Sequence, residues 1–225
     1  MISASGPLQI SLKFKFMDNS KCKRCRRLGI KLFLRGDRCT SPKCAMIKRA
    51  YPPGKKSKRR SSHFSEYAKE LRDKQILRAW YHLGEAQFRK YVKSVLQKQH
   101  KVEDAASLLV KIIESRLDNT VFRLGFAVSR AQARQQVTYG HFLVNKKPID
   151  VPSFMVKKGD KISLKPSSLK KTFFQNIKNY LKKHKTPEWL KLNAESMEGE
   201  VVGEPTLEEA APPVEISSIF EFYSR

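Results

Sequence analysis

The four cysteines of this chain form two close pairs, Cys22 with Cys25 and Cys39 with Cys44. The spacing C-x2-C-x13-C-x4-C lets each pair form a knuckle and lets the second knuckle return to the first, so that four thiolates can surround one ion. Zinc suits such a set, and a site closed by four protein ligands is structural rather than catalytic. We therefore expect one structural Zn²⁺ per chain. An iron–sulfur cluster, disulfides and free thiols are the alternatives.

Basic residues surround these cysteines. Between positions 17 and 63 there are 16 Lys and Arg against two acids, Asp18 and Asp37. Neighbouring cations lower the pKa of a thiol and favour the metal-binding thiolate. A metal would also fix the shape of a segment that is too highly charged to pack a conventional core. We expect the fixed segment to present a phosphate-binding surface made of Arg24, Arg26, Arg27, Lys43, Lys48 and Arg49.

The whole chain is strongly basic, with 46 Lys and Arg against 21 Asp and Glu and a formal net charge of +25 over 225 residues. A compact domain with this charge repels itself, so it normally lies next to a polyanion. Nucleic acid is the first candidate and an anionic membrane surface the second. From Ala194 onward there are eight Glu and one base, Arg225. Polyanion binding is therefore predicted for the first 193 residues.

Membrane insertion and export are not indicated. No apolar run approaches the roughly 20 residues that span a bilayer. The first 16 residues lack the apolar centre and cleavage site of a signal peptide. We expect a cytoplasmic protein with reduced thiols and no membrane partner. Residues 1–16 carry no core pattern and are expected to form a disordered N-terminal extension.

Apolar residues at helical spacing predict three helices after the cysteines. The first begins at His63, the second follows Gly84, and the third runs from Ala105 to Leu117. The apolar and aromatic residues of these helices are expected to form a core. The opposite faces of the first two are basic, and we expect RNA contacts from Arg72, Lys74, Arg78 and Arg89.

The second half of the chain alternates between helical and strand-like patterns. Ser129 is placed to cap a helix that ends near Gly140. Short strands are predicted at 142–144, 149–151 and 161–164, with turns between them. A basic helix is predicted from Lys170 to Lys185, ended by Pro187. The apolar C-terminus that follows the acidic stretch is expected to dock on the protein.

One stretch, ESRLDNTVFRLGFAVSRAQARQQVTYGHFLVNKKPIDVPSFMVKKGDKISL, resembles the small α-plus-β RNA-binding module of many RNA-associated proteins. The resemblance implies two helices packed on a short twisted sheet, with RNA along the second helix and the following turn. Arg130 and Arg134 have the i, i+4 spacing that can straddle an RNA backbone, and Gln135 lies beside them. Arg116, Arg123 and His141 complete the contacts expected from this module.

Further stretches narrow the resemblance. CRRLGIKLFLRGDRCTSPKCA…YPPG, LRDKQILRAWYHLGEAQFRKY, PEWL and FEFYSR are similar, in order and separation, to the bacterial small-subunit ribosomal protein four family. The match covers roughly residues 17–225. It implies a structural protein that binds small-subunit ribosomal RNA early in assembly, at a multi-helix junction in the body of the subunit. Some family members also repress translation of their own messenger.

The family resemblance also implies neighbours. It implies a monomer within the ribosome, close to the channel through which messenger RNA enters, in contact with small-subunit ribosomal proteins three and five. The contact with protein five bears on translational accuracy. On this basis the residues expected to face messenger RNA are those of the charged connector, Lys55, Lys56, Lys58, Arg59 and Arg60.

The predicted architecture is α+β. A zinc-knuckle and helical domain spans residues 17–104 and is completed by 186–225. The RNA-binding module and basic helix are inserted at 105–185, with the module core at 114–164. One departure from the family is the hairpin turn, where Asn145-Lys146 replaces the frequent Asn-Gly. Some family members lack the cysteines, as expected of a metal that stabilises a loop and performs no chemistry.

The rival function is an RNA-modifying enzyme that carries the same module. Arg116-Leu117-Asp118 resembles a string in which some pseudouridine synthases place their catalytic Asp. Here the string lies inside the module, and no segment remains for a large catalytic domain. We expect Asp118 to be an internal hydrogen-bond or salt-bridge partner and the chain not to be an enzyme. A DNA-binding zinc protein is disfavoured because the spacing lacks the C2H2 helix pattern.

Overall fold

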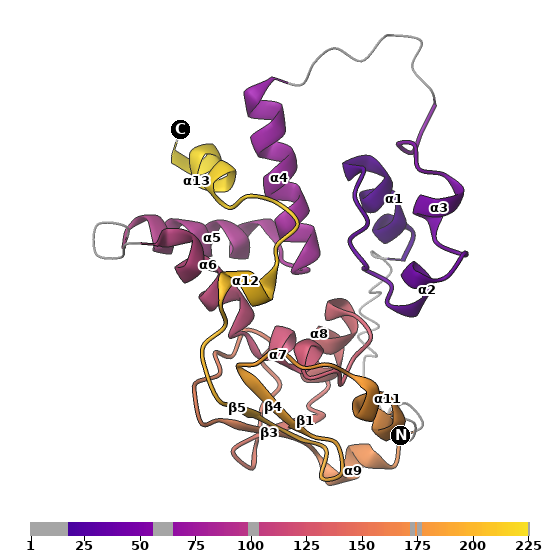
Figure 1. The fold of residues 1–225 in the computed structure, drawn as a ribbon, viewed down its shortest axis with the longest axis vertical. Helices are drawn as coiled ribbons and strands as arrows, with labels where there is room; N and C mark the ends of the chain where they lie inside the picture. The colour runs from indigo at the N-terminus through magenta and orange to yellow at the C-terminus, as the bar shows by residue number, and fades with distance from the viewer. Residues whose placement is uncertain (1–17, 56–64, 99–103, 172–173, 175–176, 225) are drawn as a thin grey trace, which may run out of the picture.

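The computed structural model describes residues 18–55, 65–98, 104–171, 174 and 177–224. Figure 1 shows three parts: a helical domain, a part that contains a sheet, and the cysteine-bearing segment at their side. Residues 1–16, where we predicted a disordered extension, lie outside the described residues. None of the described helices combines the length and the hydrophobicity that crossing a bilayer requires.

The cysteine segment, residues 18–55, contains three short helices. These are α1 (Asp18–Leu28), α2 (Asp37–Thr40) and α3 (Ala45–Lys48). Cys25, Leu32 and Leu34 are buried and pack against Ile76 and Ala79 of α4 (Glu66–Trp80). The segment therefore has a small apolar core, which it shares with the helical domain. Its charge does not prevent a core, contrary to our expectation.

The helical domain is built from helices at both ends of the chain. Besides α4 it contains α5 (Glu85–Leu96), α6 (Ala105–Glu114), α12 (Leu207–Ala210) and α13 (Ser217–Ser224). Side-chain caps start α4 and α6: Ser65 Oγ accepts from Ala68 N at 3.3 Å, and Asp104 Oδ1 accepts from Ala106 N at 2.9 Å. The shared core includes Leu77, Phe88, Val92, Leu109 and Ile219.

The C-terminal helix docks as predicted. α13 packs on α4 and α5, and Figure 1 shows it beside α4 at the top of the view. Ile219 of α13 is fully buried, and the Tyr223 hydroxyl donates to Glu85 Oε1 at 3.1 Å. The tail thus returns to cover helices that were formed much earlier in the sequence.

The sheet-containing part, called the module below, begins with α7 (Leu117–Arg123) and α8 (Arg130–Thr138). Its sheet has the strand order β2-β1-β3-β5-β4, and all pairs are antiparallel. The strands are β1 (Phe142–Val144), β2 (Lys147–Pro148), β3 (Lys161–Leu164), β4 (Leu190–Asn193) and β5 (Glu198–Val201). Two further helices, α9 (Pro166–Leu169) and α11 (Ile177–Lys183), follow β3.

Several elements of the module match their sequence predictions. Ser129 caps α8, with its hydroxyl accepting from Gln132 N at 3.4 Å. The predicted strands 142–144 and 161–164 coincide with β1 and β3. The strand predicted at 149–151 is wrong, because the residues that pair with β1 are Lys147 and Pro148. Within the predicted basic helix, the structure assigns α11 from Ile177, and Pro187 follows its end.

The hairpin between β1 and β2 closes tightly without a glycine. Asn145 and Lys146 both adopt left-handed backbone, with φ of 49° and 67°, as a two-residue hairpin turn requires. The Asn145 side chain donates to Asp160 Oδ1 at 2.8 Å and accepts from Lys161 N at 3.0 Å. These bonds hold the turn in place, so Lys146 adopts a conformation that favours glycine.

The boundaries of the parts differ from those predicted at 105 and 185. Strands β4 and β5 were assigned to the helical domain, but they extend the sheet of the module through pairing with β3. Gly199 of β5 lies so close to the module core that an added Cβ would be 2.5 Å from Leu124 Cδ1. In the other direction, α6 packs in the core of the helical domain. The chain from Leu190 onward therefore contributes first to the module, through β4 and β5, and then to the helical domain, through α12 and α13.

Candidate nucleic-acid interface

The four cysteines gather around one space in the cysteine segment. Cys22 and Cys25 lie one turn apart on α1, Cys39 lies in α2, and Cys44 precedes α3. Their side chains help to line a cavity of about 10 Å³, roughly the room that one water-sized sphere needs. All four are free thiols rather than disulfides. Four sulfurs around a space of this size suit a small thiophilic cation.

A formed metal site is not present in the described residues, because no group of three or more His, Cys, Asp or Glu is arranged to hold an ion. The four predicted ligands line one cavity without forming a metal site, so the metal stays a prediction. Burial raises the pKa of the Cys25 and Cys39 thiols, although the backbone N–H groups of Leu32 and Arg35 oppose this. Lys31 lowers the pKa of Cys39 as predicted for a neighbouring cation, but burial outweighs this effect, and the pKa of both thiols is raised.

The predicted phosphate-binding residues of the cysteine segment divide into two sets. Arg27, Lys43, Lys48 and Arg49 are exposed. Arg26 is partly used inside the segment, since its Nε donates to the Tyr51 carbonyl oxygen at 2.9 Å and its guanidinium lies 5.0 Å from that ring. Arg24 is half-buried, and both burial and the neighbouring Arg78 lower its pKa. Four of the six cations thus remain open to a polyanion.

The charged connector is visible only at its start. Lys55 is exposed. Lys56, Lys58, Arg59 and Arg60 lie outside the described residues. Their predicted contact with messenger RNA therefore stays a prediction.

The basic face predicted on α4 is largely internal. Lys74 is buried, with its Nζ 2.7 Å from Glu85 Oε1 and 4.4 Å from the Phe222 ring centroid. Arg78 Nη1 lies 3.1 Å from the other oxygen of the same carboxylate. The prediction that Lys74 faces RNA is wrong, because Glu85 and the aromatic side chains of α13 enclose it. Arg78 is held beside it by the same acid.

The remaining two cations of these helices stay at the surface. Arg72 is exposed, but its Nη2 and Nε donate to the Leu28 carbonyl oxygen at 2.7 and 3.2 Å. This side chain ties α4 to the C-terminal end of α1. Arg89 on α5 is exposed, and its contact with RNA stays a prediction.

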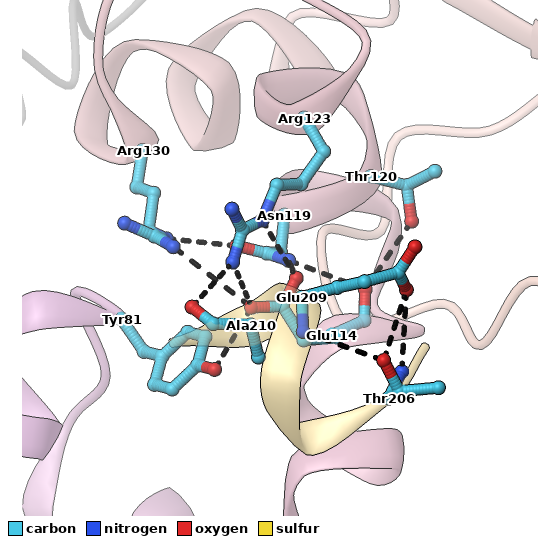
Figure 2. Close-up of polar contacts among 9 residues, drawn as sticks. All are labelled: Tyr81, Glu114, Asn119, Thr120, Arg123, Arg130, Thr206, Glu209 and Ala210. Carbon is cyan, nitrogen blue, oxygen red and sulfur yellow. Dashed lines mark hydrogen bonds and ion pairs between the residues drawn. The ribbon is translucent and has the colours of Figure 1, made fainter. Parts of the chain in front are cut away.

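A buried carboxylate joins the helical domain to the module. Glu114 at the end of α6 is completely buried, and Figure 2 shows the side chains that converge on it. Tyr81 donates its hydroxyl to Oε1 at 2.8 Å, and Asn119 donates to Oε2. Arg123 donates through Nη2 to Oε1 at 2.7 Å and through Nε to Oε2 at 3.0 Å. We call Tyr81, Glu114, Asn119, Arg123 and Arg130 the Glu114 hub.

The hub explains why Glu114 stays ionised inside the protein. Burial alone would raise its pKa, but hydrogen bonding and charge from Arg123 hold the pKa below its ordinary value. Arg123 also donates to the Ala210 carbonyl oxygen at 3.1 Å, which ties α12 to the same point (Figure 2). The RNA contact predicted for Arg123 is not supported by its position, because the side chain is 19% exposed and its Nε and Nη2 are bound inside the protein.

Arg130 is the second cation of the hub. Its side chain is only 10% exposed, and its Nε donates to Asn119 Oδ1 at 2.8 Å. The guanidinium lies 4.1 Å from the Trp80 ring centroid and 4.6 Å from that of Phe122, within cation–π range. Burial lowers its pKa to about 10. The predicted exposed pair of Arg130 and Arg134 is therefore wrong, since Arg130 points into the junction.

Arg116 and Asp118 form a second buried pair close to the hub. Arg116 donates through Nη2 and Nε to the two Asp118 oxygens at 2.7 and 3.0 Å, and through Nη1 to the Tyr91 hydroxyl at 2.6 Å. Asp118 is thus the internal partner that we predicted. The RNA contact predicted for Arg116 is wrong, because its side chain is only 2% exposed.

The outer face of α8 leaves Gln135 exposed among the residues predicted to contact RNA. Gln135 is exposed and donates to the Tyr139 hydroxyl at 3.1 Å. Arg134 is half-buried, with Nη1 3.4 Å from the His82 carbonyl oxygen. His141 is buried: its Nδ1 lies 3.0 Å from Ser168 Oγ, and burial lowers its pKa. A direct RNA contact by His141 is therefore not supported by its position.

The sequence interpretation missed the exposed cations of the module. They lie mainly in turns and at strand ends, which the search for helical spacing did not cover. They include Lys146, Lys147, Lys157, Lys158, Lys161, Lys165, Lys170 and Lys171. With the open cations of the cysteine segment they contribute to the positive surface of the described chain.

The sequence of this chain is similar to known proteins along most of its length. Residues 17–112 match the Ribosomal protein S4/S9 N-terminal domain, and residues 115–162 match the S4 domain. The chain is 44% identical over 204 residues to "Small ribosomal subunit protein uS4" of Thermus thermophilus, covering 91% of this chain and 96% of that one. The protein of the same name from Syntrophomonas wolfei is 45% identical over 207 residues, or 92% and 98% of the two chains.

The chain belongs to the uS4 family. A third relative of this name, from Acetivibrio thermocellus, is 43% identical over 206 residues, or 92% of this chain and 97% of that protein. The relatives are named as ribosomal proteins and not as enzymes. The pseudouridine synthase alternative is therefore set aside, in agreement with the internal role of Asp118.

The uS4 assignment gives the Glu114 hub a place in the chain. The two family matches end and begin at residues 112 and 115, and Glu114 lies between them. The hub thus fixes the N-terminal domain to the S4 domain at the point where one passes into the other. The sequence interpretation did not predict this hub. Its signal was Glu114 directly after the apolar run SLLVKII, because a Glu in a buried stretch is normally paired with a cation.

Proposed function

We propose that this chain is the uS4 constituent of the small ribosomal subunit and binds the ribosomal RNA of that subunit directly, in the cytoplasm. The observation that carries the proposal is similarity along 91% of the chain, which includes both the N-terminal domain and the S4 domain. A module alone occurs in several classes of protein, but the combination is specific. The net charge of +25 supplies the non-specific attraction to RNA.

RNA co-purification tests this proposal. The tagged full-length chain should recover small-subunit ribosomal RNA from cell lysate in preference to large-subunit ribosomal RNA and tRNA. A charge-reversal variant, Arg27→Glu with Arg49→Glu, replaces two exposed cations and should reduce recovery without unfolding the chain. Equal recovery of all RNA classes by the unaltered chain would contradict the proposal.

An early role in assembly is part of the same proposal. A protein that nucleates folding of the subunit body must bind ribosomal RNA that carries no other protein. The fixed relation between cysteine segment, helical domain and module supports this, because a preorganised surface loses less entropy on binding. The measurement is binding to protein-free small-subunit ribosomal RNA, and a requirement for other subunit proteins would contradict it.

We also propose one structural zinc ion, held by Cys22, Cys25, Cys39 and Cys44. Their gathering around a small cavity and their free thiols support this. A bound zinc would supply a fixed tetrahedral link between α1, α2 and α3 and would keep the four sulfurs as thiolates. Metal analysis should return about one zinc per chain. Visible absorption of an iron–sulfur cluster in the purified chain would contradict zinc.

Chelation provides a second readout for the zinc. Removing the metal should increase hydrogen exchange in residues 20–50 and leave the module at 114–164 protected, because their cores are separate. Cys44→Ser should reproduce the effect without chelator, and Ser41→Ala is the matched control outside the ligand set. An unchanged exchange pattern in Cys44→Ser would contradict a structural role.

The finer placement follows the family resemblance and is proposed on that ground. The chain would lie near the channel through which messenger RNA enters, contact small-subunit ribosomal proteins three and five, and influence accuracy through protein five. Lys55 supports the messenger contact through its exposure. Charge reversal of the connector at Lys55, Lys56, Lys58, Arg59 and Arg60 should impair passage of ribosomes through structured messengers. Unaltered passage would contradict the placement.

A further inference from the structure

Phe33 combines a strained backbone with an exposed ring. Six non-glycine residues in the described part of the chain have positive φ, and Phe33 is one of them at 51°. Met197, at φ 54°, is 9% exposed and packs in the core of the module, so burial offsets its strain. Phe33 is 51% exposed and gains no such offset. A bulky residue at positive φ that faces solvent calls for a functional explanation.

The backbone on both sides holds the ring in this position. Leu32 and Leu34 are buried and pack on Ile76 of α4. Three residues later, Gly36 donates its N–H to the Phe33 carbonyl oxygen at 3.4 Å. Gly36 in turn lies so close to Val128 that an added Cβ would be 2.7 Å from its carbonyl oxygen. The loop is therefore fixed on the helical domain and on the chain just before α8, with the Phe33 side chain outside.

The surroundings of the ring are cationic. Lys31 Nζ lies 5.2 Å from the Phe33 ring centroid, within cation–π range. Arg35 and Arg38 follow in the sequence, and Arg38 is exposed. A protein partner would need a contiguous apolar patch, whereas an exposed aromatic ring beside cations is the arrangement that binds single-stranded nucleic acid.

We propose that Phe33 is a stacking site for one unpaired nucleobase, with Lys31 binding the adjacent phosphate. The inference rests on the proposed function, because it requires RNA to lie on the cysteine segment. The left-handed backbone turns the ring out of the loop, and the buried leucines on either side keep it there. The ring is thus ready for stacking before RNA arrives, which lowers the entropy lost on binding.

Binding of full-length variants to protein-free small-subunit ribosomal RNA tests the site, measured at several salt concentrations. Phe33→Leu keeps an apolar side chain but removes the ring, and should weaken binding about tenfold. The slope of log affinity against log salt should stay unchanged, because the ring neutralises no phosphate. Phe33→Trp should bind within about threefold of the unaltered chain. Ile47→Ala, an exposed apolar residue of the same segment, is the matched control.

The outcomes separate the stacking site from the proposed function. If the unaltered chain binds ribosomal RNA but Phe33→Leu binds within about twofold of it, only the stacking site is overturned. Equal losses in Phe33→Leu and Ile47→Ala would also overturn it, because they would point to general apolar contact. If the unaltered chain does not prefer ribosomal RNA over an unrelated RNA, the proposed function fails, and the stacking site falls with it.

The melting temperature of Phe33→Gly separates a binding role of the Phe33 ring from a structural one. Glycine removes the strain at positive φ, so the melting temperature should rise by about 2 °C. RNA affinity should fall as in Phe33→Leu. A lowered melting temperature in Phe33→Gly would show that the ring stabilises the fold, and would overturn its assignment as a binding residue.

Discussion

The cysteine segment and the Glu114 hub use arginine in opposite ways. In the cysteine segment Arg27 and Arg49 are exposed. In the hub Arg123 and Arg130 are drawn inward around one carboxylate, which is fully buried. Both regions looked alike in the sequence, as basic residues in a polyanion-binding protein. The difference is the presence of an acid within reach.

This difference shows how the basic chain holds itself together. Charge repulsion opposes folding in a chain of net charge +25. The few acids that lie in the folded body are placed where they neutralise clustered cations: Glu85 for Lys74 and Arg78, Asp118 for Arg116, and Glu114 for Arg123 and Arg130. Exposed cations without such a partner, such as Arg27 and Arg49, are the ones that we propose bind RNA.

Glu114→Gln should have the largest effect on stability. The substitution leaves Arg123 and Arg130 buried without a counter-charge, so the free energy of unfolding should fall by about 3–5 kcal/mol. Denaturant titration measures this. Glu66→Gln is the control, since it removes an exposed pair with Lys69 and should cost less than about 0.5 kcal/mol. Equal costs for the two variants would remove the distinction between hub and surface.

Asp118→Asn should destabilise the chain by about 3 kcal/mol, because it leaves the buried Arg116 with Tyr91 as its only other polar partner among the described contacts. The variant should leave pseudouridine in cellular RNA unchanged. Denaturant titration and RNA modification mapping check the two parts. Loss of a specific pseudouridine would restore the enzyme hypothesis.

Arg130→Ala should affect stability, whereas Arg49→Ala should affect RNA binding. Removing Arg130 deletes the contact with Trp80 and should lower the free energy of unfolding by about 2 kcal/mol, with little change in the salt dependence of RNA binding. Removing the exposed Arg49 should leave stability unchanged and reduce the slope of log affinity against log salt by about 1. Melting curves and salt-dependent binding test both variants. A reduced slope in Arg130→Ala would mean that Arg130 reaches RNA after all.

Lys146→Gly should have the smallest effect, and it should be stabilising. Lys146 has φ 67° in the hairpin turn, where a side chain costs about 1–2 kcal/mol and glycine removes part of that cost. We expect a net gain of about 0.5–1 kcal/mol in the free energy of unfolding. Lys147→Gly, in strand β2, should instead destabilise the hairpin. A loss of stability in Lys146→Gly would show that its side chain contributes to folding.

The sequence predicted those elements whose signals are local. Ser129 capped a helix, β1 and β3 lay where strand patterns were expected, and the C-terminal helix docked. The pairing of β5 with β3 could not be predicted, because it joins residues about 40 positions apart through backbone bonds that leave no side-chain pattern. Gly199 and the polar residues of these short strands gave only a weak strand signal.

The candidate interface was predicted less well than the fold. Residue type and i, i+4 spacing placed Arg130 on a helix face, but could not tell which face was covered. Trp80 and Phe122 cover that face, and they come from α4 and α7. Burial of a cation depends on such distant partners, so the exposed and internal arginines could be separated only in three dimensions.

The position of α12 and α13 has a consequence for the order of synthesis. α4 and α5 emerge from the ribosome long before the residues that cover them, and Arg123 must wait for the Ala210 carbonyl oxygen that it binds in the finished chain. A nascent chain therefore holds its helical domain unfinished while its module is already translated. The bond between Arg123 and Ala210 can form only after translation has passed residue 210, so we expect chains broken off earlier to hold the helical domain and the module together less firmly.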